Sequence, residues 1–124
     1  MKNRETTEKH QDHGAKHAKR YAERVEDFER LGHLDAFTRR LIWTLAQIEL
    51  EEERLQMEVT ERGAFETILT DKGDERERAA ARWNMLKDCR ARIQAICGQI
   101  ERVLRAQREN TEARPDPEVE AFFT

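Results

Sequence analysis

Serine is absent from this chain of 124 residues, and glycine, proline and cysteine are sparse, with five, two and two copies. Without serine, neither a Ser-His-Asp triad nor a nucleophile elbow nor a Walker-type serine can form. The glycines form no cluster that could hold a phosphate group. We therefore expect a protein that is not an enzyme and that uses no cofactor.

Long hydrophobic runs are missing too, and none approaches the roughly 18 residues that a membrane-spanning helix needs. Cys89 and Cys97 stand in one helical stretch, roughly 12 Å apart at the rise of an α-helix, which is too far for a disulfide. We expect an intracellular protein in a reducing compartment, with no membrane partner.

What the chain does contain is charge: 40% of its residues are charged and 37% are hydrophobic. This balance favours long amphipathic helices that bury one narrow stripe. Apolar residues recur at helical spacing from Ala18 to Phe28, ahead of a stop at Gly32. Asp35 is a predicted N-cap, and two heptad-like seams follow it, from Leu34 to Val59 and from Ala79 to Leu104.

The predicted fold is all-α. A helix at about 15–31 precedes a long antiparallel hairpin of helices at about 35–62 and 76–109. The connector carries a turn signal at Thr70–Gly73, with room for a short extended piece before it. We expect three regions: a disordered basic N-terminus at 1–14, a helical domain at 15–109 and an acidic-aromatic tail at 110–124.

The two seams superpose when the chain folds back at the connector. Val59 then meets Trp83, and Leu55 meets Leu86. This register also brings the charged residues Glu52 and Arg90 face to face. We expect that pair to help align the helices, with both side chains extending to water as the alternative.

Each long helix has a second apolar line that a two-helix hairpin does not need. Because one short helix cannot cover both lines, we predict that helix faces join several copies into a homo-oligomer. The expected oligomerisation residues are Ile42, Ala46, Leu50, Met57, Met85, Ile96 and Val103.

The net charge of −3 conceals segregated blocks. Residues 1–24 carry seven positive and four negative side chains, whereas residues 49–61 carry six glutamates and one arginine. Blocks of opposite sign can attract each other within the fold or between subunits. The predicted nucleic-acid-binding face follows one side of the first helix, where solvation alone is the alternative reading. It consists of Lys16, Lys19, Arg20 and Arg24.

Two further patterns have simple interpretations. His10, His13 and His17 share helical spacing but lack a fourth ligand and a firm scaffold, so we expect no metal site. In the tail, Phe122 and Phe123 follow several acids, a pattern typical of segments that dock onto a partner, with local packing or disorder as alternatives.

The order of these parts resembles the small terminase subunits of tailed bacteriophages. The resemblance covers about residues 28–105. It begins with Leu-Gly-His-Leu-Asp and a long helix that ends in Glu-Arg-Gly-Ala. Thr-Ile-Leu-Thr-Asp-Lys-Gly follows, and then a helix rich in arginine and alanine.

This resemblance implies a non-enzymatic, ring-forming subunit that binds double-stranded viral DNA and presents it to the large terminase subunit. It also implies a location in the cytoplasm of the infected bacterial host. The alternative function is a helical hairpin that binds another protein, such as an antitoxin-like regulator, and does not bind DNA.

Overall fold

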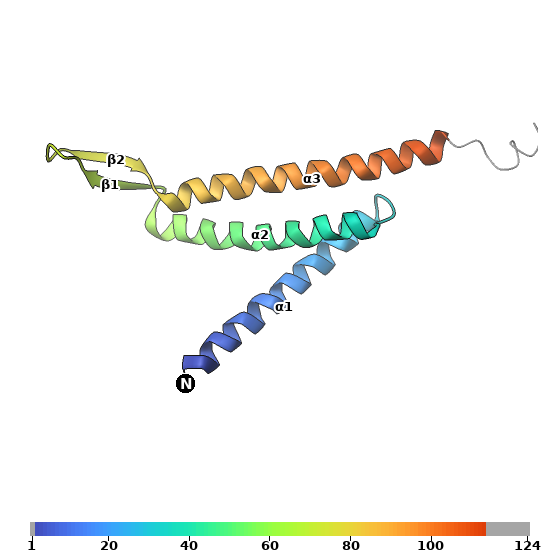
Figure 1. Ribbon diagram of the computed structural model, residues 1–124, viewed down its shortest axis with the longest axis horizontal. Coiled ribbons are helices and arrows are strands. Elements are labelled where there is room, and N and C mark those ends of the chain that lie inside the picture. The colour runs from blue at the N-terminus through green and yellow to red at the C-terminus, as the bar shows by residue number, and fades with distance from the viewer. Residues whose placement is uncertain (1, 114–124) are drawn as a thin grey trace, which may run out of the picture.

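The computed structural model describes the backbone of residues 2–113 and the side chains of residues 13–110. The elements follow in the order α1 (Lys2–Glu29), α2 (Ala36–Arg62), β1 (Phe65–Leu69), β2 (Glu75–Ala79) and α3 (Ala81–Ala113). Helices α2 and α3 lie side by side and antiparallel, the β-hairpin extends beyond their shared end, and α1 contacts α2 at an angle (Figure 1). The predicted helical hairpin with an N-terminal helix is therefore confirmed as a mostly helical fold.

The N-terminal helix is much longer than predicted. It begins at Lys2, whereas the sequence predicted a start near residue 15 after a disordered segment. Residues 2–14 have no apolar period, which is why no helix was expected there. A polar stretch can nevertheless continue a helix that its C-terminal half has already nucleated, since each added residue costs little once the first turn exists.

Helix α2 begins and ends as its sequence predicts. The Oδ1 atom of Asp35 accepts a hydrogen bond from the backbone N–H of Thr38 at 2.7 Å, which satisfies one free donor of the first turn. This hydrogen bonding to Thr38 lowers the pKa of the Asp35 carboxyl below its ordinary value. At the other end, Gly63 takes φ +89°, where a side chain would be strained, and its N–H bonds the Val59 carbonyl at 2.7 Å.

The prediction that the fold is strictly all-α is wrong, because residues 65–79 form an antiparallel β-hairpin. The register pairs Phe65 with Ala79 and Leu69 with Glu75. The turn is closed by the Gly73 N–H bonding the Thr70 carbonyl at 2.8 Å, with Gly73 at φ +83°. Because β2 takes the residues that were assigned to the start of the second long helix, α3 begins at Ala81 instead of about residue 76.

An arginine holds the base of this hairpin against the helices. The guanidinium of Arg82 donates to the Gly63 carbonyl at 2.7 Å and to the Arg62 carbonyl at 3.0 Å. These carbonyls lie at the end of α2, where no intrahelical donor remains for them. One side chain of α3 therefore caps α2 and links the two long helices where the hairpin leaves them.

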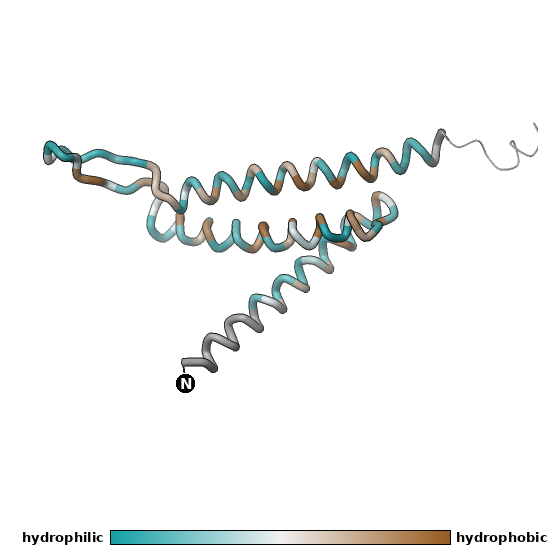
Figure 2. The backbone as a smooth tube through the Cα atoms, viewed as in Figure 1, coloured by the Kyte–Doolittle hydropathy of each residue, from teal (hydrophilic) through white to brown (hydrophobic). Residues whose placement is uncertain are grey.

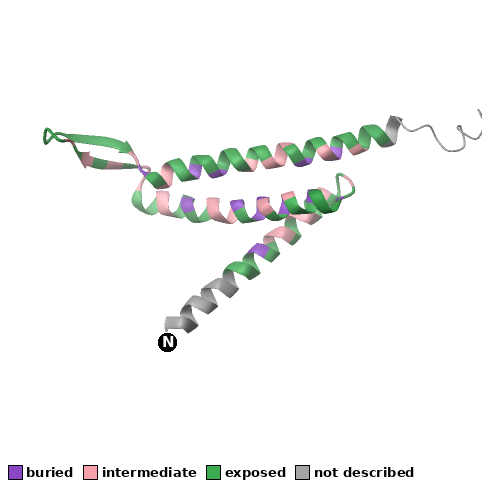
Figure 3. Cartoon of the chain, in the orientation of Figure 1, coloured by how far each residue is buried: buried purple, intermediate pink, exposed green. Residues whose placement is uncertain are grey.

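The core runs along α2 and α3 as two adjoining clusters, and neither strand of the hairpin contains a buried residue (Figure 3). Hydrophobic positions recur between hydrophilic ones along both helices (Figure 2). The cluster near the α1–α2 turn has a buried centre of Leu34, Ile42, Leu45, Ile100 and Leu104. The cluster near the β-hairpin has Ile48, Leu55, Leu86 and Cys89.

The predicted helix register agrees with these clusters, since Leu55 packs in the same cluster as Leu86, and Val59 in the same one as Trp83. The predicted pair of Glu52 and Arg90 is wrong. Arg90 instead donates to the Oε1 atom of Gln56, one helical turn further along α2. Arg90 is exposed, so its long side chain can lie along the surface to a neutral acceptor without entering the seam.

Candidate interaction surfaces

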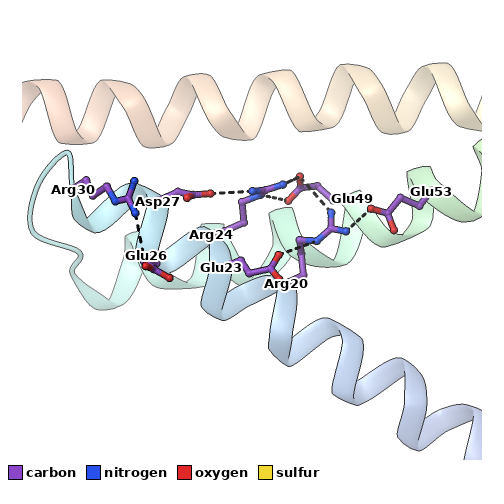
Figure 4. Close-up of polar contacts among 8 residues, drawn as sticks. All are labelled: Arg20, Glu23, Arg24, Glu26, Asp27, Arg30, Glu49 and Glu53. Carbon is purple, nitrogen blue, oxygen red and sulfur yellow. Dashed lines mark hydrogen bonds and ion pairs between the residues drawn. The ribbon is translucent and has the colours of Figure 1, made fainter.

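Half of the predicted DNA-binding face is used inside the molecule. Arg24 donates to Glu49 through Nε at 2.8 and 3.1 Å and through Nη2 at 2.8 Å, a forked arrangement, and through Nη1 to Asp27 at 3.0 Å. Arg20 binds Glu53 and lies 3.7 Å from Glu49 (Figure 4). These contacts join α1 to α2, so Arg20 and Arg24 mainly hold the fold together.

Glu49 is the centre of this arrangement, which we call the α1–α2 ion-pair cluster and which comprises Arg20, Arg24, Glu49 and Glu53. The Glu49 side chain is only 16% exposed. Hydrogen bonding to Glu49 raises the pKa of Arg24 further above its ordinary value. The acidic block at 49–61 was therefore the sequence signal for this pairing, because blocks of opposite sign attract within a fold.

Lys16 and Lys19, the other half of the predicted face, are exposed. They lie on the turns of α1 next to Arg20, and no ion pair joins either of them to another of residues 13–110. Their charge is available to a partner, but two lysines are a smaller cationic surface than the four residues that the sequence predicted.

Helix α3 carries the larger set of cations without ion pairs. Among residues 13–110, every ion pair joins residues of α1, the α1–α2 turn, α2 or the β-hairpin, and none involves α3. Arg102 donates to the Gly98 carbonyl at 3.3 Å and Arg108 to the Leu31 carbonyl at 3.4 Å, so both contact neutral oxygens only. The exposed cations of α3 are Lys87, Arg90, Arg92, Arg102, Arg105 and Arg108.

The seven predicted oligomerisation residues fall into three groups. Ile42 and Ala46 are fully buried within the single chain, so assigning them to a contact between copies was wrong. The cause is α1, whose Tyr21, Val25 and Phe28 pack against the cluster that contains Ile42. The half-buried residues are Leu50, Ile96 and Val103. Only Met57 and Met85 are exposed, at 65% and 48%.

The β-hairpin adds apolar surface that the sequence analysis did not single out. Phe65 and Leu69 of β1 are 58% and 75% exposed and lie on the same face of the strand, because an even number of residues separates their positions. The signal that could have identified them is a short run with β-forming residues, Phe-Glu-Thr-Ile-Leu, directly before a turn. Met57 and Met85 are exposed toward the same end of the molecule, whereas Leu31, Phe37 and Trp43 are exposed nearer the α1–α2 turn.

The histidines do not share a site. The ring of His17 is buried against Trp43, with ring centroids 3.8 Å apart and its Nε2 atom 2.9 Å from the Trp43 carbonyl oxygen. His13 is exposed, and His10 lies outside the part of the chain whose side chains are described. No group of three potential metal ligands occurs among the described residues.

A pocket of about 500 Å³ opens beside Trp43. Tyr21 of α1 lines it together with four residues of α2: Arg39, Arg40, Trp43 and Thr44. Tyr21 meets the Trp43 ring edge-on, with centroids 5.1 Å apart. This site was not predicted, because its aromatic and cationic residues come from two helices whose crossing the sequence does not specify.

The remaining predicted features add no reactive group. Cys89 and Cys97 are both free, and burial raises the pKa of each thiol, which keeps them protonated and poorly nucleophilic. Phe122 and Phe123 lie outside the described residues. In the part of the chain that the structure describes, no helix has the length and apolar character needed to cross a membrane.

Comparison of the chain with protein-family models, with curated proteins and with solved structures finds no match.

Proposed function

We propose that this chain is a small terminase subunit of a tailed bacteriophage, a non-enzymatic homo-oligomer that binds viral DNA and presents it to the large terminase subunit in the cytoplasm of the infected host. The resemblance of residues 28–105 to that family supports the proposal, and the chain order of helix, glycine-containing turn, long helix, hairpin and arginine-rich helix agrees with it.

The observation that carries the proposal is the separation of charge between the helices. Acidic residues of α2 neutralise Arg20 and Arg24 of α1, whereas the exposed cations of α3 have no ion pair within residues 13–110. Cations spread along an exposed helix can neutralise successive DNA phosphates without reading bases. We therefore place the main DNA contact on α3, with Lys16 and Lys19 as a smaller contribution.

Oligomerisation draws its support from the exposed apolar residues that remain. Met57, Met85, Phe65 and Leu69 are all about half exposed or more. An isolated two-stranded hairpin is also marginally stable in water unless another surface covers it. A neighbouring copy that packs against the hairpin end would cover these residues, and we propose that the contact between subunits lies there.

A second candidate function is a protein-interaction module without DNA binding. The α1–α2 ion-pair cluster favours this second function, because two of the four cations on the predicted DNA-binding face are paired with glutamates in the cluster. The two candidates differ in whether the chain retains DNA.

Replacing Arg102 and Arg105 of α3 together with glutamine is expected to weaken binding to a double-stranded DNA fragment about tenfold, uniformly across sequences. The slope of the logarithm of affinity against the logarithm of salt concentration should fall by about two, because two phosphate contacts are lost. Fluorescence anisotropy over a salt series measures both quantities.

The matched control changes two cations on the other helix, Lys16→Gln with Lys19→Gln. If that variant loses more affinity than the α3 variant, the main DNA contact lies on α1. If the unaltered chain shows no salt-dependent binding to DNA, the packaging function is wrong and the protein-interaction function stands.

Replacing Met57 and Met85 together with glutamate is expected to shift the protein from an oligomer to smaller species, because a charge in a dry contact between copies is not compensated. Native mass spectrometry at micromolar concentration reports the distribution. Phe37→Glu is the control, since Phe37 is 54% exposed at the opposite end of α2. A monomeric unaltered chain, or an oligomer that survives both methionine changes, would contradict this contact.

A further inference from the structure

We propose that the acidic-aromatic segment 114–124 folds back on its own chain and inserts Phe122 and Phe123 into the pocket beside Trp43. This inference does not depend on DNA binding. It assigns the two phenylalanines a binding site within their own chain. A partner that binds these phenylalanines would first have to displace them from that site.

The pocket has an aromatic wall that is held in place before anything binds. Trp43 is 45% exposed, and the buried ring of His17 packs against its indole ring. Tyr21 approaches the same indole ring edge-on. A side chain held on two sides loses little conformational freedom on binding, so this pocket suits another aromatic ring.

The pocket also carries positive charge at its rim. Arg40 is exposed and forms no ion pair with any of residues 13–110, and Arg39 lies at a loose 3.4 Å from Glu29. In the segment, Asp116, Glu118 and Glu120 alternate ahead of the two phenylalanines. A segment of this composition offers aromatic rings to the apolar wall and carboxylates to the arginines, which matches the pocket in both respects.

The chain is long enough to reach this site. Arg108 of α3 contacts Leu31 in the α1–α2 turn, and α3 ends at Ala113, about 7.5 Å further along its axis. The pocket residues Arg39–Thr44 lie within about 15 Å of the same turn along α2. Residues 114–122, if extended, span up to about 30 Å, enough to turn back and pass around α2.

Attachment to the same chain favours this occupant over a free peptide. A segment joined by a short linker has an effective concentration of the order of millimolar at its site, so a weak contact is still well occupied. Docking within one chain also does not depend on how many copies assemble. Protection of the pocket should therefore be independent of protein concentration.

The test uses the full-length chain with Trp83→Phe, which leaves Trp43 as the only tryptophan. Acrylamide quenching of the Trp43 fluorescence measures how far solvent reaches the indole ring. Adding Phe122→Ala with Phe123→Ala is expected to raise the quenching constant about twofold, because the covering rings are gone. The increase should be equal at low and high micromolar concentration.

Two further variants separate docking from a general disturbance. Lys72→Ala changes an exposed residue in the turn of the β-hairpin, far from the pocket in sequence, and should leave the quenching constant unchanged. Arg40→Glu should raise the constant as the phenylalanine changes do, and Glu120→Arg in the same chain should restore protection. Circular dichroism checks that each variant remains helical.

Three results would overturn the inference. The first is a quenching constant that does not respond to the loss of Phe122 and Phe123. The second is protection that appears only at high protein concentration, which would place the segment of another copy in the pocket. The third is protection of Trp43 by a single-stranded oligonucleotide with no effect of the phenylalanine changes, which would make the pocket a nucleotide site. None of these results bears on whether α3 binds double-stranded DNA.

Discussion

Leu86→Ala is expected to lower the free energy of unfolding by about 2–5 kcal/mol, the usual cost of removing most of a leucine side chain from a closed core. Leu86 is 0% exposed and contributes to the cluster at the hairpin end of α2 and α3. Because small domains are only marginally stable, a loss of this size leaves a large unfolded fraction. Urea denaturation followed by circular dichroism gives the midpoint and the free energy.

The neighbouring residue provides a matched control. Met85 precedes Leu86 in α3 but is 48% exposed, so Met85→Ala should change the free energy of unfolding by less than about 1 kcal/mol. Similar losses for the two variants would mean that α3 does not present the Leu86 face to α2. They would also mean that the register between α2 and α3 is wrong.

Glu49→Gln is expected to lower the free energy of unfolding by about 1–3 kcal/mol, as hydrogen bonds between charged groups are worth more than neutral ones. The glutamine is the same size but removes the negative charge between Arg24 and Arg20. It leaves two neighbouring guanidinium groups without their shared counter-charge. Thermal and urea unfolding in low and high salt measure the loss of stability. The loss should be smaller at high salt, because salt screens the exposed charges of the cluster.

Glu53→Gln is the control one helical turn away. Within residues 13–110, Glu53 pairs with Arg20 alone, and it is 54% exposed, so its loss should cost less than about 1 kcal/mol. Equal effects of the two substitutions would show that the fork between Arg24 and Glu49 contributes nothing special to the contact of α1 with α2.

The long helices were predictable because their signals are local and repeated. Residues such as Leu45, Leu55, Leu86 and Ile100 recur at spacings that only a helix places on one face, and all four are buried. The cap at Asp35 and the stop at Gly63 depend on neighbouring residues alone, and both occur as predicted.

The β-hairpin was harder to predict because its second strand has the composition of a helix. Residues 75–79 read Glu-Arg-Glu-Arg-Ala, and all five have a high helix propensity. They form a strand because the turn at Thr70–Gly73 returns the chain alongside β1, where Arg78 pairs with Glu66 at 2.8 Å. Pairing with a non-adjacent segment therefore overrides a local preference.

The functional surfaces depended even more on the packing of α1. On an isolated helix, the basic residues Arg20 and Arg24 would be free to bind a partner. The same holds for the apolar residues Ile42 and Ala46. Once α1 crosses α2, the arginines meet Glu49 and Glu53, and the apolar pair is covered. The same crossing creates the pocket beside Trp43.

The sequence by itself determined the helical class, the antiparallel pairing of two long helices and the segregation of charge, because helical periodicity, capping and net charge are properties of short segments. Only the tertiary structure decided which charges and apolar faces remain available to other molecules. The reason is that exposure depends on which segments distant in the chain come into contact. Here the crossing of α1 over α2 neutralises Arg20 and Arg24, half of one predicted cationic face, whereas the cations of α3 form no ion pair within residues 13–110.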